Sequence, residues 1–132
     1  MAGFWVYCVQ KNIDRSGGAG LPGAMGESMH LSKQIESMYD DAVRIRQDLH
    51  RIPEIGFQLR DTQAYVLREL KQCGPDRIET PAVCGVKAVF FAKDAETTIA
   101  FRADMDGIHN DEANDVPYCS QHPGNMHGCG HD

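Results

Sequence analysis

Long apolar runs are scarce in this sequence of 132 residues. The only apolar start, Gly3–Val9, is shorter than the roughly 20 residues that a membrane-spanning helix needs. It also lacks the basic lead-in and the small-residue cleavage site of a secretory signal. We therefore expect a cytoplasmic chain with no membrane partner.

Positive charge and paired cysteines are also scarce. The net charge is −6 at pH 7 and no run of Lys or Arg stands out, so the basic surface that binds phosphate backbones is missing and we expect no nucleic-acid partner. The five cysteines are an odd set without a CxxC pair, which favours reduced thiols over a disulfide framework. Of these, Cys73 and Cys84 are predicted to be small buried apolar side chains.

The composition that remains is that of a globular protein, with 42% apolar and 24% charged residues. Residues 1–30 are predicted to be a poorly ordered N-terminal extension, because the glycine-rich run 16–23 interrupts any regular element. Met25 or Met29 is an alternative start of the chain. Residues 31–132 are predicted to fold, and the pattern of their elements indicates the α/β class.

Two helices and two strands are predicted in that part. The first helix begins at Ser32 as N-cap, carries one apolar face and ends at Pro53. The second is capped by Asp61 or Thr62 and ends at Gly74. The β-rich runs 85–92 and 97–102 are then predicted to pair as a hairpin. The carboxyl end of the second strand is where we expect the site, because open α/β sheets commonly bind ligands there.

Side chains that can do chemistry follow that strand. Asp104 and Asp106 would face the same side if the strand geometry persisted, and such a pair can orient a metal-bound His or accept a proton. Turn chemistry is the alternative interpretation of this pair. In the closing segment 122–132, Cys129 and His131 are both usual donors to zinc, and the glycines beside them let the backbone bend around an ion.

The alternative for the closing segment is a polar loop with chance His and Cys residues. Two donors do not complete a site, since catalytic zinc takes three protein ligands and water. The missing donors are either among Asp104, Asp106 and His109 or outside this sequence.

Three stretches, residues 46–57, 100–106 and 122–132, occur in the order and with the spacing of a known family. From about residue 32 onward the chain resembles the metallopeptidase-like amidohydrolases, which include aminoacylases, hippurate hydrolase and indole-acetyl-amino-acid hydrolases. The resemblance implies the N-terminal part of a zinc-peptidase-like catalytic domain over residues 31–132. His109 stands where the family usually has Pro, which leaves details on the substrate side open.

The resemblance also implies functions for single residues. Cys129 and His131 would be metal ligands, the thiolate bridging two divalent ions (Zn or Mn), and Asp106 would orient a ligand and support a catalytic glutamate. That glutamate, the other ligands and an inserted lid or dimerisation domain lie downstream in the family. The motif 49–57 is interpreted as structural, with His50 and Glu54 making local hydrogen bonds.

The leading hypothesis is thus a fragment of an enzyme that hydrolyses the amide bond of N-acyl-amino acids or small peptides, inactive alone, and a homodimer only with the missing lid domain. The alternative is a small self-contained metal-binding or interaction module without catalysis, with one structural metal. A third hypothesis is a non-catalytic chain whose exposed sheet edge associates with copies of itself.

Overall fold

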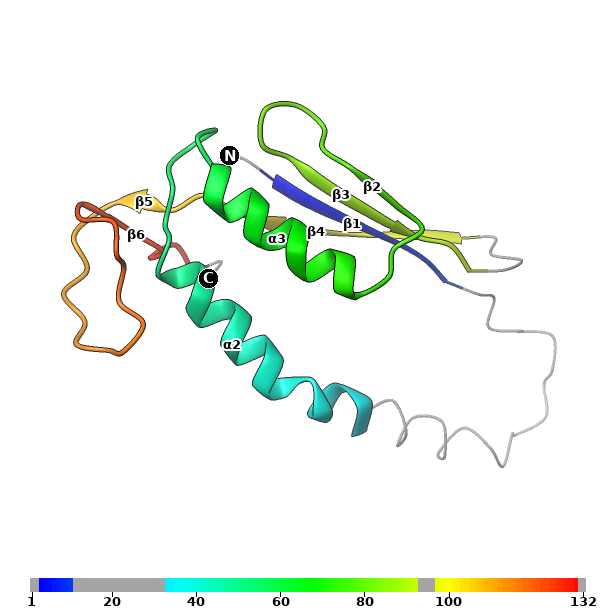
Figure 1. Cartoon of the computed structure of the whole chain (residues 1–132), viewed down its shortest axis with the longest axis horizontal. Helices are drawn as coiled ribbons and strands as arrows, with labels where there is room; N and C mark the ends of the chain where they lie inside the picture. Colours follow the sequence, from blue (N-terminus) through cyan, green and yellow to red (C-terminus); the bar gives the residue numbers. More distant parts are fainter. Residues whose placement is uncertain (1–2, 11–32, 93–96, 131–132) are drawn as a thin grey trace.

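The computed structural model describes residues 3–10, 33–92 and 97–130. Its elements in chain order are β1 (Gly3–Gln10), α2 (Tyr39–His50), α3 (Arg60–Gln72), β2 (Arg77–Glu79), β3 (Val86–Phe90), β4 (Thr97–Asp104), β5 (Ile108–His109) and β6 (Asn125–Met126). Four strands form a mixed sheet in the order β2-β3-β1-β4, and β5 and β6 form a separate two-stranded ladder. The α/β class expected from the sequence is confirmed, and Figure 1 shows both helices beside the sheet.

The first predicted helix forms, and its end is as expected. Residues 33–37 are helical, a turn follows at Met38, and α2 runs on to His50 with Arg51 as its C-cap. Proline restricts the residue before it, so Pro53 keeps the helix from continuing. The predicted N-cap, Ser32, lies outside the described residues.

The second helix begins differently from the prediction. Asp61 and Thr62 lie inside α3, whose N-cap is Leu59 and makes no side-chain capping bond. The carboxylate of Glu54 caps the helix instead, because it accepts the backbone N–H groups of Asp61 (3.2 Å) and Thr62 (2.8 Å). The predicted end at Gly74 is confirmed by that residue's φ of +66°, a conformation that glycine adopts without strain.

The predicted hairpin is wrong in its pairing. β1 lies between the two strands, parallel to β3 and antiparallel to β4, so β3 and β4 do not share hydrogen bonds. Strands on either side of a third are separated by twice the inter-strand spacing of about 4.8 Å. The six residues 91–96 between β3 and β4 are enough to cover that distance. Residues 3–10 of the expected N-terminal extension therefore belong to the sheet, whereas 11–30 fall in the part that the structure leaves undescribed and the boundary near residue 30 stays a prediction.

The core lies between α3 and one face of the sheet. Leu59, Cys84, Val86 and Met105 are buried together, and Val66, Leu67 and Leu70 of α3 pack against them. Cys84 is buried as predicted, but Cys73 at the end of α3 is exposed. A buried thiol cannot release its proton easily, so burial raises the pKa of Cys84.

The outer strand of the sheet is less well covered. Nearly all of β4 is exposed, and the Phe101 side chain is 62% exposed. Within the described residues, no helix is both long and apolar enough to cross a membrane.

Candidate metal centre

The end of β4 opens into a cleft of about 690 Å³. One wall is made by α2 and α3, and the other by residues 103–108, at and just beyond the end of β4, and by His127 and Cys129. Asp106 and Cys129, which are 23 positions apart in the sequence (129 − 106), therefore line one cleft. Most of the remaining lining is apolar, contributed by side chains such as Ile45, Leu49 and Leu70.

The two aspartates after β4 have different surroundings. The strand ends at Asp104, whose Oδ1 atom lies 2.6 Å from an Arg102 guanidinium nitrogen, so this carboxylate is already paired. Asp106 lies beyond the strand on the floor of the cleft. Strand alternation therefore does not put the two carboxylates on the same side of the sheet as predicted, because β4 ends before Asp106.

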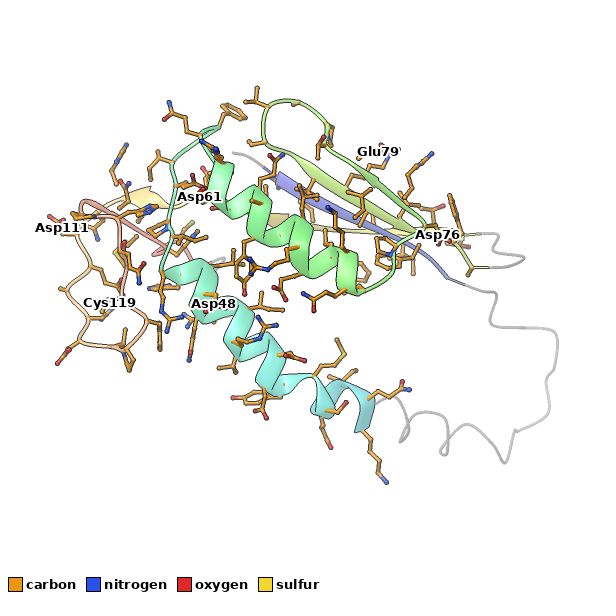
Figure 2. The ribbon with its side chains drawn as sticks, in the orientation of Figure 1. Asp48, Asp61, Asp76, Glu79, Asp111 and Cys119 are labelled. Atoms are coloured by element: carbon orange, nitrogen blue, oxygen red, sulfur yellow. The ribbon has the colours of Figure 1, made fainter. Side chains whose placement is uncertain are left out.

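A short ladder brings the two segments of the site together. Ile108 pairs with Met126 and His109 with Asn125, which lays β5 against β6. Gly107 allows this approach, since a Cβ atom there would lie 2.9 Å from the Met126 carbonyl oxygen. The loop that joins the strands carries Asp111 and Cys119 (Figure 2). The close backbone contact at Gly107 sets Asp106 opposite the segment that leads to Cys129.

The other candidate donors named from the sequence, His109 and Asp104, already have partners. The His109 ring bonds the Asn125 side chain at 3.0 Å and is exposed. Asp104 is paired with Arg102. Of the three upstream residues considered as extra ligands, Asp104 and Asp106 line the cleft, and Asp104 is the one paired with Arg102.

Sequence reasoning missed a buried polar pair beside this cleft. The Nε2 atom of His50 lies 3.0 Å from Oε1 of Glu112, and the two side chains are 5% and 4% exposed. The hydrogen bond from the Ser120 backbone N–H, followed by that with His50, lowers the pKa of Glu112. The expectation that His50 bonds locally is therefore wrong, since its partner is 62 residues away. No local pattern marks such a pair in the sequence.

The donor set fits a metal only in part. Among the described residues, no group of three or more His, Cys, Asp or Glu side chains is placed to hold an ion. Cys129 is exposed in the cleft mouth, and a thiolate is a ligand that zinc prefers. His131, the second predicted ligand, lies outside the described residues, so the convergence of the two donors stays a prediction.

Comparison with known proteins shows which family this part of the chain resembles. Residues 100–132, which include Asp106 and Cys129, match peptidase family M20/M25/M40. The recognition made from the sequence is confirmed, because this segment matches the family of metallopeptidase-like amidohydrolases and individual relatives extend the similarity.

Individual relatives extend the match beyond those residues. N-acetyldiaminopimelate deacetylase of Exiguobacterium sibiricum is 42% identical over 96 residues, and that of Bacillus subtilis is 44% identical over 94 residues. These alignments cover 69% and 70% of this chain, which spans about a quarter of each relative (25%). A solved structure of a proposed aminohydrolase from methicillin-resistant Staphylococcus aureus has a TM-score of 0.61 at 25% identity, covering 78% of this chain and 28% of that one.

Proposed function

We propose that this chain supplies the first metal-binding residues of an amidohydrolase that cleaves the amide bond of N-acyl-amino acids. The observation that carries the proposal is the shared cleft, in which Asp106 at the end of β4 meets the loop bearing Cys129. The family match over residues 100–132 supports it, because it contains both residues.

Each residue has a chemical task in this proposal. Cys129 and His131 hold divalent metal, zinc or manganese, through sulfur and nitrogen donors. Asp106 accepts a hydrogen bond from a side chain that binds the metal and so fixes the orientation of that side chain. When bound, a divalent ion in such a site lowers the pKa of water and polarises a carbonyl. The remaining donors and the proton-transferring glutamate are proposed to come from sequence beyond these residues.

The substrate class follows from the relatives. Two of them are named for removing the acetyl group of N-acetyldiaminopimelate, so we propose an N-acetylated or otherwise N-acylated amino acid here. The apolar walls of the cleft suit the hydrocarbon part of such a molecule. We further propose a cytoplasmic location, consistent with reduced cysteines, and dimerisation only through a lid domain.

Cobalt binding to the chain of residues 1–132 tests the metal site. Cobalt(II) substitutes for zinc, and its bond to a thiolate gives a charge-transfer absorption. We expect weak binding of one ion with that absorption, its loss in Cys129→Ser, and its retention in Cys73→Ser, which removes another exposed thiol. Absorption that survives in Cys129→Ser would refute the assignment of the sulfur ligand.

Two further results separate this proposal from its alternatives. We expect no hydrolysis of N-acetyl-amino acids by the chain alone. Tight binding of two ions would contradict the view that donors are missing. Tight binding of one ion, with folding lost on chelation, would favour a self-contained metal module, which the described residues do not support with three clustered donors.

A further inference from the structure

The segment 50–55 begins with the last residue of α2 and continues into the connection to α3. It contacts residues 107–122 of the candidate site at nearly every position. The Arg51 carbonyl accepts the Gln121 N–H (2.8 Å), and the Glu54 carbonyl accepts the Gly107 N–H (2.8 Å). Between them, the Pro53 carbonyl lies 2.9 Å from Nδ1 of His122. Both ends of the 107–122 segment are therefore tied to one short stretch of backbone.

The buried pair adds the middle of the loop to this arrangement. His50, at the last position of α2, meets one oxygen of Glu112, while the other oxygen accepts the Ser120 N–H at 2.7 Å. Because both side chains are nearly inaccessible to water, their hydrogen bonds cannot be exchanged for water without cost. Glu112 thus fixes two points of the loop, positions 112 and 120, against the end of α2.

The same histidine reaches the metal-binding side of the loop. The His50 ring lies 6.2 Å from the ring of His127 and 5.6 Å, edge-on, from that of Tyr118. His127 lines the cleft with Cys129, two residues further on. Segment 50–55 also contacts the residue next to Asp106. A Cβ atom at Gly107 would lie 3.0 Å from the Pro53 side chain, so Gly107 packs directly on this segment.

We infer that the buried His50–Glu112 pair is a positioning pair for the candidate metal centre, which sets the separation of Asp106 and Cys129 across the cleft. This inference rests on the proposed function, because it assigns the pair to the geometry of that site. If the pair served folding alone, its loss would lower the stability of the chain without a specific loss of metal affinity. The two possibilities differ in what the loss of Glu112 does to metal binding at constant stability.

Cobalt titration of residues 1–132 with three variants makes that comparison. Glu112→Ala removes the carboxylate, whereas Glu112→Gln keeps an oxygen that accepts the Ser120 N–H and an NH2 group that can donate to Nε2 of His50 when the ring proton is on Nδ1. Glu79→Ala is the control, because it removes a glutamate that lies 3.1 Å from Lys87 between β2 and β3 and does not line the cleft. Thermal unfolding and amide hydrogen exchange of each variant are measured alongside.

We expect Glu112→Ala to weaken cobalt binding by roughly 10- to 100-fold, the usual effect of removing a group that orients metal ligands. Glu112→Gln should restore binding to within about threefold of the original chain, since its hydrogen bonds remain. Glu79→Ala should bind as the original chain does, even if its unfolding temperature falls. Should Glu112→Ala not fold, Glu112→Asp, which keeps the charge but shortens the side chain, takes its place with the same expected order.

Equal binding by Glu112→Ala and the original chain overturns the inference, as does an equal loss of binding in Glu79→Ala. Failure of the original chain to bind cobalt refutes the metal site of the proposed function instead. In that case amide hydrogen exchange tests whether the pair positions residues 106–129. The inference requires faster exchange over 106–129 in Glu112→Ala with α3 and β3 unchanged, and uniform acceleration overturns it.

Discussion

The capping of α3 by Glu54 leads to a quantitative expectation for stability. The carboxylate accepts two N–H groups of the first turn, and Thr62 is 2% exposed, so water does not replace the bond to its N–H. Loss of a capping side chain costs about 0.5–2 kcal/mol, and loss of a negative charge near a helix N-terminus about 0.3–1 kcal/mol. We therefore expect Glu54→Ala to lower the free energy of unfolding by about 1–3 kcal/mol.

Urea denaturation followed by circular dichroism measures this change. Glu54→Gln, which loses the charge but keeps one acceptor oxygen, should cost less than Glu54→Ala. Asp61→Ala is the control, because it removes a carboxylate at the same helix start (Figure 2) whose effect is through charge alone, about 0.3–1 kcal/mol. The hydrogen bond from the Gly107 N–H to Glu54 is accepted by the backbone carbonyl of Glu54, so a change of the Glu54 side chain does not remove it. Equal effects of Glu54→Ala and Asp61→Ala would refute the capping argument.

Three further expectations concern the core and two ionisable groups. Leu59→Ala should destabilise the chain by about 2–5 kcal/mol in the same assay, because Leu59 is 1% exposed and its loss leaves a cavity. Folding lowers the pKa of Glu112 below its unfolded value of about 4.3, so the ionised carboxylate stabilises the folded state above that pH. Stability should therefore fall as the pH drops below about 4.3, and Glu112→Gln should lose this part of the pH dependence. Burial, then the bond to Asp48, raises the pKa of Tyr65 to about 12. Ultraviolet titration should therefore show a tyrosinate phase near pH 12 that is lost in Tyr65→Phe.

Local sequence signals were reliable where a single residue restricts the backbone. Pro53 and Gly74 ended the two helices as predicted, and Gly56 has a φ of +60° in the turn that follows the first. The position of Asp106 just beyond a strand end was also predictable, because a β-rich run followed by Asp-x-Asp indicates it. These features depend on residues within a few positions of one another.

Pairing between distant segments was not predictable in the same way. A hairpin between 85–92 and 97–102 is the simplest pairing of adjacent β-rich runs, and nothing within either run shows that β1 lies between them. Likewise, Glu54 bonds to the start of α3 across the turn, so neither Asp61 nor Thr62 is needed as the cap. In each case a competing partner is supplied by another part of the chain.

The sequence by itself was sufficient to recognise the resemblance to the family and to predict Cys129 and His131 as ligands, because both steps depend on residue types and their spacing. The tertiary structure alone brought Asp106 and Cys129 to one cleft and paired His50 with Glu112. Segments that are far apart in the chain meet only when burial makes their hydrogen bonds more favourable than bonds to water. That condition depends on the whole fold and leaves no local mark in the sequence.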